Sequence, residues 1–340
     1  PSRTIQRGEG GQIVAMPLWR CEGSGRNGEK SGFDVNLEKS IPERILERIL
    51  DRMARMPRET NRRIAAALGR IWYRLDKRHR KIALENLKMA FGDELSEGRR
   101  QEICREVFDH LARVVLEIPY VRTLNRGNLD QFATFRGGEH LQAALEKKQG
   151  LLVMTSHFGN WELMAVGFSM RYWPFNIVVR PLDNPLFDRL VDQMRCQAGN
   201  KTIQKRGSVR QVLRLLRQGE IVALLIDQNT DWYDAVFVPF FNELAGTNKA
   251  LAVLALRTGL PVLPVYNVRR PDGRYELIIE PEIPIVRTGD TTMDIEENTA
   301  RFNRVIEAYV RRNPEQWFWV HRRWKTRPYQ PWPRQIQVHR

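Results

Sequence analysis

The sequence predicts an α/β fold: a mixed, largely parallel central sheet flanked by helices and preceded by an N-terminal basic amphipathic helical region. From residue 132 onward, short apolar runs alternate with segments of helical periodicity, which is typical of βαβ units. Before that point, apolar residues and arginines recur every three or four positions, which indicates amphipathic helices. We therefore divide the chain into a disordered or poorly ordered extension rich in Gly and Ser (1–40), a helical region (41–125) and an α/β domain (126–340).

Charge and cysteine content restrict the class of protein. The 340 residues carry a net charge of +15, which favours an anionic lipid surface, an acidic protein or nucleic acid as partner. Cys21, Cys104 and Cys196 have no metal-ligand spacing, and an odd number argues against a disulfide framework. No HExxH motif occurs, so we expect no metal. No run of 18 apolar residues occurs either, so we expect no transmembrane helix.

The helical region begins after Ser40, which is a suitable N-cap. Ile45 and Ile49 belong to an apolar stripe, and a basic stripe runs beside it at a spacing of about four: Arg44, Arg48, Arg52 and Arg55. A second basic amphipathic segment covers residues 60–87. Such helices can lie in a membrane interface with arginines on lipid phosphates, so we expect 41–125 to associate with an anionic membrane surface. The alternative is an ordinary surface helix with a solvated charged face.

The remaining elements follow from periodicity and flanking turn residues. A helix is expected at 97–122, with apolar residues near period 3.6. In the α/β domain we expect helices at 139–147, 184–197, 208–217, 247–258 and 292–312. Strands are expected at 151–155, 175–180, 220–226, 261–267 and 274–280.

The stretch 149–164, QGLLVMTSHFGNWELM, contains the most informative pair of residues. A buried strand leads into a turn at His157, and helical spacing starts at Trp161. His157 and Glu162 are five residues apart, so they can meet only if His157 lies in the turn and Glu162 in the first helical turn. A carboxylate on one imidazole nitrogen leaves the other nitrogen as a base. The alternative is a capping or core histidine bonded to backbone.

Several stretches together carry a family resemblance. They include RKIALENLKMAFGDELS (80–96), HFGNWE (157–162), VVRPLDNPLFDRL (178–190), LRQGEIVALLIDQN (216–229) and WVHRRWKTRP (319–328). In order and spacing they resemble the late acyltransferases of lipid A biosynthesis, of the lauroyl/myristoyl type. These belong to the acyltransferase superfamily with a His-x4-Asp/Glu motif. The resemblance covers residues 80–328, about three quarters of the chain.

The resemblance implies transfer of a fatty acyl group from an acyl carrier protein thioester to a hydroxyl of a Kdo-bearing lipid A precursor. His157 would be the general base and Glu162 would orient it; no cofactor is implied. The partners would be acyl carrier protein, the lipid A precursor and the membrane surface, on the cytoplasmic face of the cell inner membrane as a peripheral enzyme. One alternative is acyl-CoA-dependent acylation of another glycolipid, such as a phosphatidylinositol mannoside. A remote alternative, a basic nucleic-acid-binding protein, rests on charge alone, and we expect no nucleic acid partner.

Further site residues combine the resemblance with the chemistry of the side chains. Backbone amides near Gly159 and Asn160 are candidate oxyanion donors, although Gly159 also suits a plain turn. The candidate substrate-binding residues are Arg180, Arg195, Asp227, Lys205 and Arg206, because guanidinium and ammonium groups bind phosphates and carboxylates. Arg180 could instead pair with Asp183, and Asp227 could instead cap a strand end.

The C-terminal stretch interleaves aromatic and basic residues. Trp317, Phe318, Trp319 and Trp324 alternate with His321, Arg322, Arg323, Lys325 and Arg327. This pattern suits a lipid headgroup boundary, and it also suits single-stranded nucleic acid.

Overall fold

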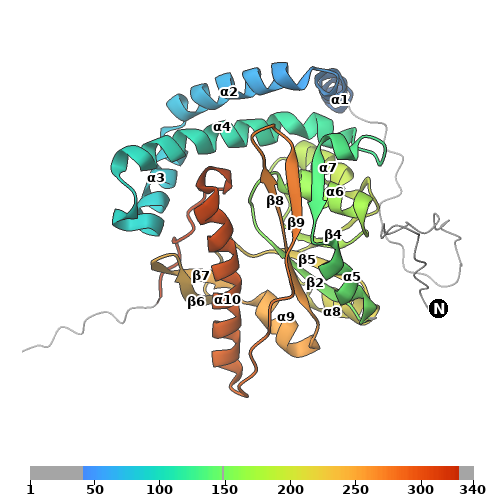
Figure 1. The fold of residues 1–340 in the computed structure, drawn as a ribbon, viewed down its shortest axis with the longest axis vertical. Coiled ribbons are helices and arrows are strands. Elements are labelled where there is room, and N and C mark those ends of the chain that lie inside the picture. The colour runs from blue at the N-terminus through green and yellow to red at the C-terminus, as the bar shows by residue number, and fades with distance from the viewer. Residues whose placement is uncertain (1–40, 148, 329–340) are drawn as a thin grey trace, which may run out of the picture.

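A computed structural model of the chain describes residues 41–147 and 149–328, and the extension predicted at 1–40 lies outside them (Figure 1). Its centre is a seven-stranded sheet in the order β1-β9-β8-β2-β5-β3-β4. The strands are β1 (Ala133–Arg136), β2 (Leu151–Thr155), β3 (Asn176–Val179), β4 (Lys201–Gln204), β5 (Ile221–Leu225), β8 (Val262–Arg269) and β9 (Tyr275–Ile279). Only β8 and β9 pair antiparallel among these neighbours. The predicted mixed, largely parallel sheet is confirmed.

Helices cover both faces of the sheet, as the run of buried strand residues predicts. Along β2, Leu152 and Met154 pack into one core cluster, whereas Leu151 and Val153 pack into another. The first cluster is closed by α8 (Val209–Arg217), α9 (Ala250–Thr258) and α10 (Thr291–Arg312). The second is closed by α5 (Gly138–Glu146) and α6 (Trp161–Arg171), with α7 (Pro185–Cys196) packed beside α6.

The N-terminal helices form a layer across one end of the sheet (Figure 1). They are α1 (Ile41–Ala54), α2 (Arg58–Leu75), α3 (Lys77–Phe91) and α4 (Glu97–Arg122). Helix α2 lies so close to α4 that a Cβ at Gly69 would stand only 2.7 Å from the Cα of Asp109. Asn61 Nδ2 of α2 donates to Leu116 O of α4 at 2.9 Å, and Tyr120 Oη of α4 donates at 2.7 Å to Met56 O, in the link between α1 and α2. Helix α2 is therefore held tightly against α4.

Four strands were not predicted. β1 and β4 have four residues each and lie at the two edges of the sheet, where polar residues weaken the apolar signal. The other two, β6 (Ala235–Phe240) and β7 (Glu243–Asn248), form a separate antiparallel hairpin. The hairpin packs on α10, and Asn303 of α10 donates to Pro239 O at 3.0 Å.

The interpretation of the C-terminal aromatic residues as a surface boundary is wrong. Trp317 and Trp319 are fully buried, and Trp324 is buried beside Phe240. Arg323 is also fully buried, and its guanidinium donates to Gly246 O at 2.8 Å in the hairpin. This irregular segment crosses the core and has no helical or strand period, so its burial leaves no pattern in the sequence.

From the sequence we expect no transmembrane helix. Across residues 41–147 and 149–328, none of the helices combines the length and apolar character that a bilayer crossing requires.

Candidate active site

Five of the predicted site residues follow neighbouring strands of the sheet, at the carboxyl ends of those strands. His157 follows β2 and Asp227 follows β5, and these two strands pair in parallel. Arg180 follows β3, and Lys205 and Arg206 follow β4, the next strands along the sheet. The carboxyl ends of parallel strands meet at one edge, where sites in α/β proteins open. The topology therefore brings these five residues to the same side of the molecule.

Asp227 holds His157 by two hydrogen bonds. Nδ1 of His157 lies 2.8 Å from Oδ1 of Asp227, and the backbone N–H of His157 donates to Oδ2 at 2.9 Å. The indole N–H of Trp317 also donates to Oδ2, at 2.8 Å. Asp227 is fully buried, whereas the imidazole of His157 is 22% exposed. Because a carboxylate accepts from Nδ1–H, the remaining nitrogen, Nε2, is left as a base at the exposed side.

The charge of Asp227 follows from these contacts. Burial by itself raises the pKa of this carboxyl. The nearby His157 and its hydrogen bonds outweigh burial, and the pKa falls to about 2. The carboxylate is therefore charged at neutral pH. It can stabilise a positive charge on the imidazole when Nε2 takes up a proton.

The prediction that Glu162 orients His157 is wrong. Glu162 does lie in the first turn of α6, as predicted, but both of its carboxylate oxygens accept from Arg195 of α7. The Nε–Oε2 distance in this pair is 2.8 Å, and both side chains are mostly buried. The orienting carboxylate comes instead from Asp227, 70 residues after the histidine. The sequence could not reveal which of the two carboxylates contacts the imidazole, because that depends on how the strands pair.

The arginine predicted to bind phosphate is engaged within the protein. Arg195 donates from Nε and Nη2 to Glu162, and this pair joins α6 to α7 beside the site. Arg180, Lys205 and Arg206 are exposed at the same edge, and Nζ of Lys205 stands 4.0 Å from Asp234. Their role in substrate binding stays a prediction.

The turn after His157 requires glycine at position 159. Gly159 has φ +62°, and a Cβ there would lie 2.0 Å from the backbone oxygen of Asn267. Its N–H donates to Gln316 O at 2.9 Å, so this amide is already used and is not a free oxyanion donor. Asn160 caps α6, since its Oδ1 accepts from Leu163 N at 3.0 Å. Of the two predicted oxyanion donors, the Asn160 amide is the one left.

Aromatic rings shape the immediate surroundings of the base. The ring of Trp161 lies 5.3 Å from the imidazole of His157, edge to face, and the ring of Phe318 lies at 5.9 Å. Phe318 N also donates to His157 O at 3.1 Å. On the exposed side, Nε2 of Gln228 stands 3.4 Å from Nε2 of His157. The arrangement suits a base that meets its substrate from the surface.

Sequence reasoning missed Trp317 and Gln316 as parts of the site. Both lie in the C-terminal segment, about 160 residues after His157 in the printed sequence, so no local spacing joins them. Their one sequence signal was the aromatic cluster itself, which we interpreted as a surface.

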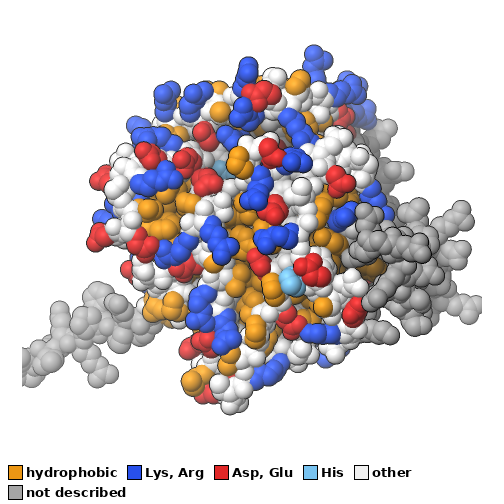
Figure 2. Space-filling model, viewed as in Figure 1, with side chains coloured by type: hydrophobic (Ala, Val, Ile, Leu, Met, Phe, Trp, Pro, Cys, Tyr) orange, Lys and Arg blue, Asp and Glu red, His pale blue; other side chains and the backbone are white. Residues whose placement is uncertain are grey.

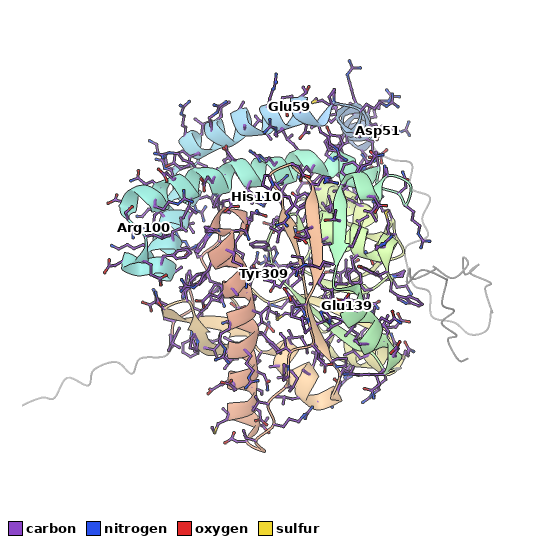
Figure 3. The ribbon with its side chains drawn as sticks, viewed as in Figure 1. Asp51, Glu59, Arg100, His110, Glu139 and Tyr309 are labelled. Carbon is purple, nitrogen blue, oxygen red and sulfur yellow. The ribbon has the colours of Figure 1, made fainter. Side chains whose placement is uncertain are left out.

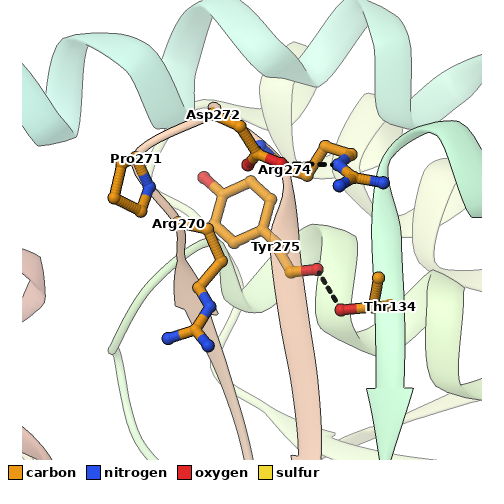
Figure 4. A pocket seen from close by; sticks show the side chains of 6 residues that line it. All are labelled: Thr134, Arg270, Pro271, Asp272, Arg274 and Tyr275. Carbon is orange, nitrogen blue, oxygen red and sulfur yellow. Dashed lines mark hydrogen bonds and ion pairs between the residues drawn. The ribbon is translucent and has the colours of Figure 1, made fainter.

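A shallow hollow lies elsewhere, at the turn between β8 and β9 (Figure 4). It measures about 340 Å³ and is lined by Thr134, Arg270, Pro271, Asp272, Arg274 and Tyr275. Neither His157 nor Asp227 lines it, so this hollow is not the space beside the candidate base.

Comparison with known proteins adds an independent finding. Residues 46–326 match the family described as bacterial lipid A biosynthesis acyltransferase. The chain is 32% identical to the lipid A biosynthesis lauroyltransferase of Escherichia coli K12, over 78% of this chain and 85% of the relative. It is 30% identical to the palmitoleoyltransferase of the same organism, over 74% and 80% of the two chains. The phosphatidylinositol mannoside acyltransferase of Mycolicibacterium smegmatis is more distant, at 24% identity over 66% and 72%.

Proposed function

We propose that this chain, which belongs to the family of bacterial lipid A biosynthesis acyltransferases, acylates a Kdo-bearing lipid A precursor. The donor is an acyl carrier protein thioester and the acceptor group is a hydroxyl. The observation that carries the proposal is the His157–Asp227 pair at the carboxyl edge of the sheet. It supplies a base for an alcohol without a nucleophilic serine or cysteine.

The reaction needs one proton to move twice. Nε2 of His157 takes the proton of the acceptor hydroxyl while its oxygen attacks the thioester carbonyl. The C–O bond forms, and the carbonyl oxygen carries the negative charge of the tetrahedral intermediate. The intermediate collapses, the C–S bond breaks, and the imidazolium returns the proton to the thiolate. Ester and thiol leave, and the enzyme is unchanged.

Charge supports an acidic donor protein. The net charge is +15, and Arg180, Lys205 and Arg206 are exposed at the edge that carries His157. An acidic carrier would be attracted to such a face, and the encounter rate would fall with rising salt. Coenzyme A is also an anion, so the choice between the two donors is left to the assay below.

The test of the proposed function is an assay with paired donors and acceptors. Purified protein is given acyl carrier protein thioester or acyl-CoA, each with a Kdo-bearing lipid A precursor or a phosphatidylinositol mannoside. We expect product, read by mass spectrometry, only with the lipid A precursor, and faster with the carrier protein. Turnover of the mannoside alone would refute the assignment and favour the more distant relative's chemistry.

The same proposal places the protein at the cytoplasmic face of the inner membrane as a peripheral enzyme. Helices α1 and α2 carry exposed aliphatic side chains at helical spacing: Ile41, Ile45, Ile49, Ile64, Leu68, Ile71 and Leu75. We call these seven residues the aliphatic stripe. Exposed arginines accompany the stripe on both helices, and Figure 2 shows Lys and Arg side chains along this end of the molecule. Apolar side chains flanked by arginines match an anionic bilayer surface.

Charges placed in the aliphatic stripe are expected to weaken membrane binding. The variant Ile45→Glu/Leu68→Glu should bind phosphatidylglycerol-containing vesicles about tenfold less tightly or worse, because burying one aliphatic side chain contributes roughly 1.5–3 kcal/mol. Vesicle co-sedimentation measures the loss. Met293→Glu is the matched control: Met293 is 59% exposed, in the first turn of α10. Equal loss in both variants, or none in the first, would contradict docking through α1 and α2.

A further inference from the structure

Helix α4 sends two side chains, the buried His110 and the partly buried Glu117, to the turn that follows His157. His110 and Glu117 are seven residues apart, two helical turns, so they lie on one face of α4. Figure 3 shows His110 on the side of α4 that faces the sheet. Neither residue contacts His157 or Asp227, and the chemistry proposed above uses neither.

His110 bonds the backbone of the turn. Its Nε2 lies 3.0 Å from the carbonyl oxygen of Gly159, and the side chain is buried. A carbonyl only accepts, so Nε2 carries the hydrogen and donates. Burial, together with the positive charge of Arg269, lowers the pKa of His110 well below its usual value. His110 is therefore a neutral donor at physiological pH.

Glu117 bonds the next residue of the turn. Its Oε2 accepts from Asn160 Nδ2 at 2.9 Å and from the Tyr275 hydroxyl at 2.7 Å. Arg269 pairs with the same carboxylate, with Nη2 at 3.1 Å from Oε2. The ring of Tyr275 lines the hollow of Figure 4, while its hydroxyl reaches Glu117. The carboxylate is thus held from several sides and keeps the side chain of Asn160 in one position.

These bonds determine where one amide points. The peptide group between Gly159 and Asn160 is planar and trans, so the N–H of Asn160 points opposite to the Gly159 carbonyl. That carbonyl faces His110, and the Asn160 carbonyl accepts from Asn267 Nδ2 at 2.7 Å. Within residues 41–147 and 149–328, the Asn160 N–H has no hydrogen-bond acceptor. It is a free donor with a direction set by α4.

We propose that His110 and Glu117 are positioning residues, which hold the Asn160 amide where the thioester oxyanion forms. The inference rests on the proposed acyl transfer, because an oxyanion arises only if a carbonyl is attacked. A donor aimed in advance stabilises that charge without reorganisation. The two residues act through the turn and touch no reacting atom.

Two substitutions at position 110 separate positioning from packing. Gln can place an N–H where Nε2 stands, whereas Met fills similar space without a donor. We expect His110→Met to lower kcat about 10- to 100-fold, since small misplacements at a reaction centre have effects of that size. KM for both substrates and the acid-side fall of kcat/KM should stay unchanged, because the His157–Asp227 pair is intact. His110→Gln should keep kcat within about threefold of wild type.

Glu117→Gln tests the second contact, with Glu106→Gln as its control. Glu106 lies on the same helix but is exposed, and its partner is Arg99. We expect Glu117→Gln to lower kcat at temperatures well below its own Tm, and Glu106→Gln to behave as wild type. Wild-type kcat in His110→Met would overturn the inference. An equal loss of kcat in His110→Gln would also overturn it. So would a loss of kcat in His110→Met that is accompanied by parallel changes in KM and Tm. An inactive wild type in every donor and acceptor pair would instead refute the proposed function, and the inference with it.

Discussion

Replacing His157 with alanine is expected to lower kcat by about 10²- to 10⁴-fold, the usual contribution of a positioned general base. An alcohol holds its proton tightly at neutral pH, and in His157→Ala nothing stands where Nε2 receives that proton. KM for the thioester should change little, because in the proposed mechanism the imidazole contacts the acceptor hydroxyl and not the thioester. Steady-state acyl transfer with the lipid A precursor measures both constants.

His79→Ala is the matched control for this loss. His79 also pairs with a carboxylate, Asp76, at 2.7 Å, but it lies on the surface at the start of α3. The control should keep wild-type kcat, and both variants should keep a cooperative thermal transition. Turnover of His157→Ala within a few-fold of wild type would remove His157 from the mechanism.

Asp227→Asn is expected to lower kcat by about 10³-fold or more, through the wrong imidazole tautomer. Two donors, the Trp317 indole N–H and the His157 backbone N–H, meet at Oδ2 of Asp227. In the variant they require the amide oxygen at that position, so the NH₂ group faces Nδ1 of His157. Nδ1 must then accept, Nε2 carries the hydrogen, and the base is lost. Single-turnover kinetics with saturating substrates measure the chemical step.

Glu162→Gln distinguishes the two carboxylates. Glu162 contacts Arg195 and not the imidazole, so Glu162→Gln should leave the acid-side fall of kcat/KM where the wild type has it. Asp227→Asn should abolish or displace that fall. The reverse result, with the pH profile changed only in Glu162→Gln, would restore the orienting role to Glu162.

Stability should also depend on pH through Asp227. Its pKa is about 2 in the folded chain against an ordinary value of 3.8. A lowered carboxyl pKa stabilises the fold above the ordinary value, and this contribution disappears as pH falls from about 4 to about 2. The difference in unfolding free energy between wild type and Asp227→Asn should therefore shrink across that window in denaturant titrations.

The parts of the site that rest on local contacts could be predicted from the sequence. The parts that rest on contacts between distant segments could not. The strand before His157, the turn at Gly159 and the helix from Trp161 were predictable, because apolar runs and helical spacing are local signals. The partner of His157 was not, since Asp227 and Glu162 are both carboxylates and only strand order places one beside the imidazole. Trp317 was found as an aromatic residue but assigned to the surface. His110 was not singled out at all, because a histidine on a buried helix face resembles any core residue.

The bridge between Phe158 and Trp317 has a consequence for how the enzyme matures. The turn after the base is closed by residues from the far end of the chain: Gln316 accepts from Gly159, and Phe318 donates to His157. During synthesis, His157 and Asp227 leave the ribosome well before residues 316–318 are added. A nascent chain, or one clipped by a protease ahead of residue 316, therefore has the His157–Asp227 pair without the residues that close the turn beside it. We therefore expect acyl transfer only from a chain in which residues 316–318 have folded around this turn.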